Sequence, residues 1–288
     1  MKTAFIIDSS ASISEELKNH PDVYVEKLEV TWGNQVYSDT TDEKLMKEFY
    51  KQLGESKELP KTSQPKQGDL ILSYKDILKK SYDNVIVITL ASVLSGTYST
   101  FAMISENFKD QLDIRLIDSK GTSFIEENIL KYAIELTDSK VDLDTIEEKL
   151  NWIADQSHIY VLIEDLNAIA KGGRLSSMGA FIGAQLKIRP ILHFDDKGYV
   201  VVFEKLRTTK KVYKRYLELV DEAVKQFPAG FVIALAHGDA QEAALKVKGM
   251  IQEKYPDIEF RVGYLTPVLG THGGKDALGL GIMPKLPS

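Results

Sequence analysis

The sequence predicts an α/β protein built from two α/β domains. At 288 residues the chain has the length of about two ordinary domains. Short apolar runs rich in β-branched residues alternate with amphipathic helical stretches, a pattern typical of a mostly parallel sheet with helices on both faces. Near residue 157 this alternation changes, and a hairpin signal indicates a second sheet of mixed type.

The first part of the chain alternates predicted strands with predicted helices. The strands are short, apolar or β-branched, and end at polar or glycine residues. They cover residues 4–7, 23–30, 85–90 and 114–117. The helices carry apolar residues at spacings of three and four. They cover residues 43–53, 68–80, 97–109, 124–136 and 143–154. We therefore expect an N-terminal domain over residues 1–157 with a mostly parallel sheet.

The second part begins with a predicted strand and then departs from regular alternation. Predicted strands cover residues 159–163, 189–194, 199–203, 231–236 and 260–264, and predicted helices cover residues 212–227 and 240–255. A glycine-spaced helix is expected around residues 178–184. Asp195-Asp196-Lys197-Gly198 separates two apolar runs, which indicates an antiparallel hairpin. We therefore expect a C-terminal domain over residues 158–288 with a mixed sheet.

The composition argues against several classes of partner. The chain has 36 Lys+Arg and 42 Asp+Glu, a formal net charge of −6, whereas a nucleic-acid backbone is bound by clustered cations. Cysteine is absent, which excludes disulfides, thiolate metal sites and a cysteine nucleophile. No histidine pair has metal-ligand spacing, and no Walker or G-x-G-x-x-G pattern is met. We therefore expect no nucleic acid, no metal and no cofactor.

The location of the protein is expected to be cytoplasmic. The N-terminal stretch MKTAFIIDSS has too short an apolar run for a signal peptide, which requires about 7–15 apolar residues. No window approaches the roughly 18 apolar residues of a membrane span, so we expect no stable membrane insertion.

Polar segments marked by glycine or proline are candidate binding loops, because ligands of open α/β sheets bind at the carboxyl ends of strands. Thr62 belongs to a TSQP segment, and Ser95 lies in LSGTY at a predicted helix start, where hydroxyl and N–H groups suit an anion. Arg174 follows two glycines and suits a planar carboxylate or phosphate. His272, flanked by glycines in GTHGG, is positioned to reach a cleft.

Each segment also has an alternative interpretation. Asp8 and Ser95 would cap helices, TSQP would form a turn, and His272 would be a structural side chain. A catalytic alternative is a serine hydrolase that uses Ser95, His272 and a carboxylate such as Asp8, although the G-x-S-x-G pattern is not met around Ser95. Another alternative is a phosphate- or nucleotide-binding module that uses the same helix N-termini.

Taken in order, these segments resemble the DegV family of bacterial fatty-acid-binding proteins. The resemblance covers nearly the whole chain, and TSQP, LSGTY and GGR-L-S in that order are its most specific part. The matching segments are IDSSASIS (7–14), TSQP (62–65), ITLASVLSGTYST (88–100), IDS (117–119), GGRLSSMGA (172–180), IRPILHF (188–194), AHGDAQEA (236–243) and GTHGG (270–274).

The resemblance implies a non-catalytic lipid-binding protein that holds a long-chain fatty acid such as palmitate between its two domains. Thr62 and Ser95 are the hydroxyls that the family pattern selects for the carboxylate, with Arg174 and His272 near the same head group. The resemblance further implies that the fatty acid is presented to a separate kinase, which forms acyl-phosphate for phospholipid synthesis. Arg207, which follows the second-domain hairpin, is then the candidate for docking to that kinase.

Overall fold

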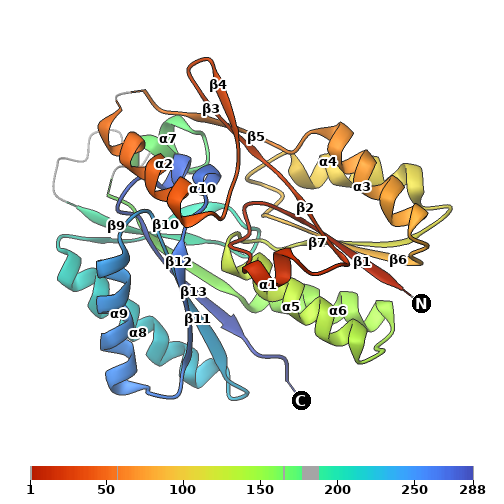
Figure 1. The fold of residues 1–288 in the computed structure, drawn as a ribbon. Coiled ribbons are helices and arrows are strands. Elements are labelled where there is room, and N and C mark those ends of the chain that lie inside the picture. Colours follow the sequence, from red (N-terminus) through yellow and green to blue (C-terminus); the bar gives the residue numbers. More distant parts are fainter. Residues whose placement is uncertain (1, 57, 165, 177–187, 288) are drawn as a thin grey trace.

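The computed structural model describes residues 2–56, 58–164, 166–176 and 188–287 and has two main sheets (Figure 1). The N-terminal sheet is parallel throughout, with the order β2-β1-β6-β7, which confirms the predicted sheet type. Its strands are β1 (Thr3–Asp8), β2 (Val23–Glu26), β6 (Asn84–Thr89) and β7 (Asp113–Asp118).

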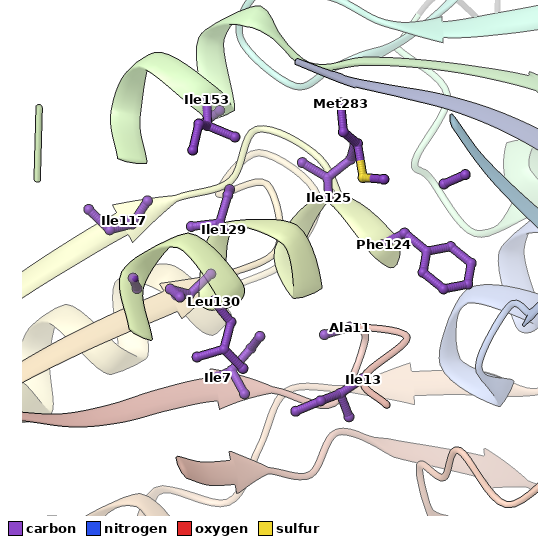
Figure 2. Packing of buried hydrophobic residues seen from close by; sticks show 14 of the residues in the cluster. Ile7, Ala11, Ile13, Ile117, Phe124, Ile125, Ile129, Leu130, Ile153 and Met283 are labelled. Atoms are coloured by element: carbon purple, nitrogen blue, oxygen red, sulfur yellow. The ribbon is translucent and has the colours of Figure 1, made fainter. Parts of the chain in front are cut away.

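Helices cover both faces of this sheet, because its central strands are buried on both sides. Every residue of β1 and β6 is buried. Successive side chains point to opposite faces, so Ile6 packs with α3 and α4, whereas Ile7 packs with α5 and α6 (Figure 2). These helices are α3 (Gln67–Lys79), α4 (Thr97–Ser105, continued by a 3-10 turn over Glu106–Phe108), α5 (Phe124–Asp138) and α6 (Leu143–Gln156).

The single strand predicted over residues 23–30 is wrong, because the structure has two strands there in different sheets. β2 ends at Glu26, and β3 (Glu29–Trp32) is the centre of a small antiparallel sheet of order β4-β3-β5. The apolar sequence pattern continues from β2 into β3 because Leu28, which lies between the two strands, is also buried. The sequence does not predict β4 (Gln35–Ser38), which is exposed at every residue, or β5 (Lys61–Ser63), which has only 3 residues.

One short helix, α1, and the predicted α2 lie in the segments between these strands. Helix α1 (Glu15–Lys18) precedes β2, and its N-cap Ser14 accepts a hydrogen bond from the Leu17 N–H. Helix α2 (Glu43–Glu55) connects β4 to β5 and packs against α10 (Pro267–Gly273), which in turn contacts α7 (Leu166–Lys171) (Figure 1). The glycine-spaced helix predicted around residues 178–184 lies outside the described residues.

The C-terminal sheet is mixed, as predicted, with the order β10-β9-β8-β13-β11-β12. Of its pairs, only β11 with β12 is parallel. The predicted hairpin joins β9 to β10, and its Gly198 has φ +84°, a conformation that glycine adopts readily. The other elements are β8 (His158–Leu162), β9 (Arg189–Phe194), β10 (Val200–Leu206), β11 (Phe231–His237), β12 (Glu259–Tyr264), α8 (Thr209–Gln226) and α9 (Gln241–Lys254).

The sequence does not predict β13 (Leu278–Pro284), although it is a central strand that pairs with both β8 and β11. Its sequence LGLGIMP contains two glycines, which weaken the strand pattern. Leu278, Leu280 and Ile282 pack in the cluster that includes α8 and α9. Gly279 and Gly281 therefore face the N-terminal part of the chain.

A hydrophobic cluster joins the two main sheets through α5 and α6. It contains Ile7 of β1, Ile129 of α5, Ile153 of α6 and Met283 of β13 (Figure 2). Ala234 of β11 belongs to the same cluster. The predicted domain boundary near residue 157 falls between α6 and β8 and stays a prediction. Among the described residues, no helix combines the length and the hydropathy needed to cross a membrane.

Candidate functional site

A cavity of about 390 Å³ lies between the two main sheets, and both parts of the chain line it. The N-terminal part contributes β5, the loop between β6 and α4, and the start of α5. The C-terminal part contributes one face of its sheet, the turn after α7, and α10. The site is therefore formed only when both parts are folded together.

Two cross-strand rows of side chains form the floor of the cavity. The first row is Leu192, Val161, Gly279 and Ala236; the second is Ile159, Gly281 and Ala234, extended by Phe194 at the end of β9. The rows contain only apolar residues, and toward β13 and β11 these residues become very small. The register of the sheet therefore produces an apolar groove.

The glycines of β13 set the depth of this groove. A Cβ at position 281 would lie 3.2 Å from the Ala234 Cβ and 3.7 Å from the Ile125 Cδ1. A Cβ at position 279 would lie 3.8 Å from the Ala236 Cβ. Larger side chains at either position would fill the space that the cavity occupies, so the small residues keep it open.

Two polar side chains of the cavity, Thr62 and His272, contact each other. Thr62 lies on β5, which pairs with β3, and His272 lies in the last turn of α10. The Thr62 Oγ1 and the His272 Nε2 are 2.9 Å apart and share a hydrogen bond. The prediction that GTHGG is a glycine-rich loop is wrong for its first part, because residues 270–273 belong to α10.

The His272 imidazole is neutral at physiological pH. Burial and, secondarily, the positive charge of Arg174 lower its pKa to about 4. Its Nδ1 is buried and has no hydrogen-bond partner. His272 therefore acts as a neutral donor or acceptor rather than as a cation.

Arg174 is the one formally charged residue among the described residues that line the cavity. It is half-buried, and its Nε donates to the Leu94 carbonyl at 3.2 Å. Gly173 has φ +72°, which permits the sharp turn after α7 that brings Arg174 to this position. Because no carboxylate of the described residues lines the cavity, its polar end favours an anion.

Ser95 follows Leu94 and therefore lies next to the backbone that Arg174 contacts. Its Oγ is 2.8 Å from the Thr97 Oγ1 and accepts a hydrogen bond from the Thr97 N–H at 3.3 Å. A Cβ at position 96 would lie 2.5 Å from the Gln64 Oε1, so a larger residue there would require this side-chain amide to move. The N-cap residue of α4 is Gly96, so the prediction that Ser95 caps this helix is wrong, although its Oγ accepts the N–H of the first helical residue.

The four residues predicted for the site, Thr62, Ser95, Arg174 and His272, all line this cavity. Arg207 is exposed after β10 and does not line it. The sequence did not identify Gln64 or Ser123, which also line the cavity. Gln64 belongs to the TSQP segment, whereas no local pattern distinguishes Ser123 or the apolar floor.

Asp8 lies in a buried polar cluster rather than in the cavity lining. Its carboxylate accepts hydrogen bonds from the Ser10 and Leu90 N–H groups at 2.9 and 2.8 Å. The Ser10 hydroxyl donates to Glu126 at 2.6 Å. Burial raises the pKa of Asp8 to about 6, and burial together with Asp8 raises the pKa of Glu126 well above its ordinary value.

These contacts give no support to the serine-hydrolase alternative. A triad requires a hydrogen bond from the serine to the histidine and one from the histidine to an acid. Ser95 instead contacts Thr97, and His272 contacts Thr62 through Nε2 while its Nδ1 has no partner. Asp8 bonds elsewhere.

Comparisons with known proteins agree with this architecture. A family model described as "Uncharacterised protein, DegV family" matches residues 2–285. Protein DegV of Bacillus subtilis is 37% identical over 282 residues, covering 97% of this chain and 98% of the relative. A DegV domain-containing protein of Listeria monocytogenes is 34% identical over 284 residues, covering 97% of each chain.

Solved structures of similar proteins have the same fold. The fatty acid binding DegV family protein from Streptococcus agalactiae matches with a TM-score of 0.89 and 32% identity, covering 99% of this chain and 100% of its own. The structure of DegV, a fatty acid binding protein from Bacillus subtilis, matches with a TM-score of 0.87 and 36% identity, with the same coverage. On the family model, the sequence relatives and these structures together, the chain belongs to the DegV family.

Proposed function

We propose that this protein is a non-catalytic, cytoplasmic fatty-acid carrier that binds a long-chain fatty acid such as palmitate in the cavity between its two sheets. The acyl chain would lie along the apolar floor. The carboxylate would lie among Thr62, Ser95, Arg174 and His272. The observation that carries the proposal is the chemistry of the cavity: most of the described lining is apolar, and its polar side chains include one cation and no carboxylate.

The polar end has the groups that a carboxylate needs. Hydroxyl groups and a guanidinium donate hydrogen bonds to a carboxylate, and Arg does so with favourable planar geometry. His272, kept neutral by burial and by Arg174, adds one more hydrogen-bonding nitrogen. The two fatty-acid-binding relatives described above, each more than 30% identical to this chain, support the same ligand class.

The acyl chain would provide most of the affinity. Burying a methylene contributes about 0.8 kcal/mol, so a C16 chain contributes on the order of 10 kcal/mol. A hydrogen bond to a charged group contributes roughly 1.5–3 kcal/mol. The head group would therefore orient the ligand, while the floor of the cavity holds it.

The direct test is mass spectrometry of an organic extract of the purified, folded protein. We expect a fatty acid at substantial occupancy, since a buried acyl chain dissociates slowly. Trace amounts of fatty acid in the extract, combined with no binding of added palmitate to delipidated protein, would show that the proposed ligand class is wrong.

We further propose that the bound carboxylate is presented to a separate kinase, which would carry the catalysis. The sequence contains no nucleotide-binding fingerprint of its own. Arg207 is exposed between β10 and α8, and Lys210 and Lys211 next to it are also exposed. Such a basic edge on an acidic protein would attract an acidic surface of the partner.

A charge reversal tests this second proposal. Arg207→Glu should lower acyl-phosphate formation with the cognate kinase and leave fatty-acid affinity unchanged. Lys225→Glu is a matched control, because Lys225 is exposed at the other end of α8. No loss with Arg207→Glu would place docking elsewhere, and equal loss of affinity would make Arg207 part of the fold or pocket.

A further inference from the structure

The small antiparallel sheet β4-β3-β5 connects the segments that form the polar end of the cavity. Thr62 is attached to this sheet directly, because β5 pairs with β3 through the Val30–Thr62 register. The segment after β4 is attached too, since the Asp39 N–H donates to the Leu28 carbonyl at 2.8 Å. Helix α10 carries His272 and follows β12 of the other main sheet, so it needs separate contacts to reach Thr62.

Asp39 provides a direct contact to α10. Its Oδ1 accepts a hydrogen bond from the Val268 N–H at 3.0 Å, in the first turn of α10. Thr266, the N-cap residue of α10, makes no side-chain capping bond to the helix. The other oxygen, Oδ2, accepts from the Ser9 hydroxyl at 3.0 Å. Asp39 thus caps a helix that lies 229 residues away in the sequence.

Tyr50 of α2 fixes the same helix from a second side. Its hydroxyl donates to the Leu265 carbonyl at 2.9 Å, just before α10. A Cβ at position 270 would lie 2.4 Å from the Tyr50 hydroxyl oxygen, so the ring packs directly on the α10 backbone. Both Asp39 and Tyr50 are almost fully buried. The contacts leave α10 little freedom to shift.

We propose that Asp39 is a positioning residue for the fatty-acid head group: by capping α10 it holds the His272 imidazole against the Thr62 hydroxyl. The small sheet then sets the Thr62–His272 separation from both sides, through β5 for Thr62 and through Asp39 for His272. This role deepens the proposed function and rests on it. It assigns to Asp39 an effect on ligand affinity without contact with the ligand.

The surroundings of Asp39 match this role. Both carboxylate oxygens accept hydrogen bonds, from Val268 and Ser9, and Thr266 also faces it. The titratable side chain that faces it from α2 is Tyr50, whose pKa burial raises well above its ordinary value, so the phenol is neutral. Burial raises the pKa of Asp39 itself to about 7.

The experiment compares Asp39→Ala and Asp39→Asn in the full chain, with Asp42→Ala as control. Asp42 caps α2 through the Leu45 N–H at 3.0 Å, so its loss removes a cap of the same kind from a helix other than α10. Two quantities are measured: the affinity of delipidated protein for palmitate, and the titration of His272 by NMR, assigned with a His272→Gln sample.

We expect Asp39→Ala to weaken palmitate binding roughly tenfold, the factor that corresponds to a helix cap of about 1.4 kcal/mol. We expect the His272 pKa to rise from about 4 toward its ordinary value of 6.5, since a displaced imidazole is less buried. Asp39→Asn keeps an acceptor oxygen for Val268, so its changes should be intermediate. Asp42→Ala should change neither quantity.

Unchanged affinity and unchanged His272 titration in folded Asp39→Ala would overturn the proposal, as would an equal loss in Asp42→Ala. If Asp39→Ala does not fold, Asp39→Asn decides alone: a raised His272 pKa supports the proposal and an unchanged one overturns it. If the wild type binds no fatty acid, the proposed function fails, while the His272 titration still tests the positioning role.

Discussion

Thr62 and Ser95 carry the hydroxyl groups on which the proposed head-group site would depend most directly. We expect Thr62→Val and Ser95→Ala each to weaken fatty-acid binding by roughly 1.5–3 kcal/mol, because each removes a hydrogen bond to a charged group. The measurement is titration of delipidated protein with a fluorescent fatty acid. Ser99→Ala is the control, since Ser99 is exposed on α4 and does not line the cavity. A double variant with unchanged affinity and an intact melting curve would rule out this head-group site.

The buried pair of Glu126 and Asp8 makes stability depend on pH. Burial and the neighbouring Asp8 raise the pKa of Glu126 when the protein folds. The stability that this group contributes is complete below its unfolded pKa of about 4.3 and is lost as pH rises through the folded pKa. We expect Glu126→Gln to make the free energy of unfolding fall less steeply between about pH 5 and pH 8, as measured by denaturant titration.

Two comparisons make the Glu126 result decisive. Glu135→Gln on the same helix should leave the slope with pH unchanged, because Glu135 is exposed. The Asp8 pKa is raised to about 6 by burial, so part of the slope should persist in Glu126→Gln. A slope identical to that of the wild type would show that Glu126 titrates normally in the folded protein.

At the scale of single elements, β13 would determine how much of an acyl chain the proposed site holds. We expect Gly281→Val to fold, because valine suits a strand and the φ of residue 281 is not in the left-handed region. Its side chain would displace the ligand from the floor. Loss of about four buried methylenes at 0.8 kcal/mol each would weaken palmitate binding by about 3 kcal/mol. Isothermal titration with palmitate measures the effect.

The matched control for this variant is Ile282→Val on the opposite face of the same strand. That change removes one methyl group from the cluster with α8 and α9 and costs about 0.5–1.5 kcal/mol of stability, but it leaves the cavity intact. Palmitate binding at wild-type strength by folded Gly281→Val would mean that the acyl chain does not follow the β13 floor.

At the scale of the whole molecule, the ligand would join two sheets that both line the proposed binding cavity. Since such a ligand binds the folded state only, palmitate at one hundred times its Kd should raise the free energy of unfolding by about 2.7 kcal/mol. Calorimetry of delipidated and reloaded protein measures the rise in Tm. Methyl palmitate, which has the same chain and no carboxylate, should stabilise less. The same Tm with and without palmitate would contradict binding between the sheets.

Much of the architecture follows from the sequence alone. The alternation of apolar residues is a local property, so it predicted the helices from α2 to α6, the helices α8 and α9, and the parallel N-terminal sheet. It also predicted the β9–β10 hairpin from Asp and Gly at 195–198. The family resemblance, carried by ordered short motifs, selected Thr62, Ser95, Arg174 and His272, which the fold brings to one cavity.

Only the tertiary structure determines which strands pair and where the packed chain leaves a cavity. No local signal reveals that Gly279 and Gly281 lie in a central strand, because a glycine has no side chain to contribute to an apolar pattern. The cavity is an absence of side chains that arises only when the register aligns these glycines with Ala234 and Ala236. Contacts across hundreds of residues, such as Asp39 with α10 and Thr62 with His272, exist only after the two sheets have packed together.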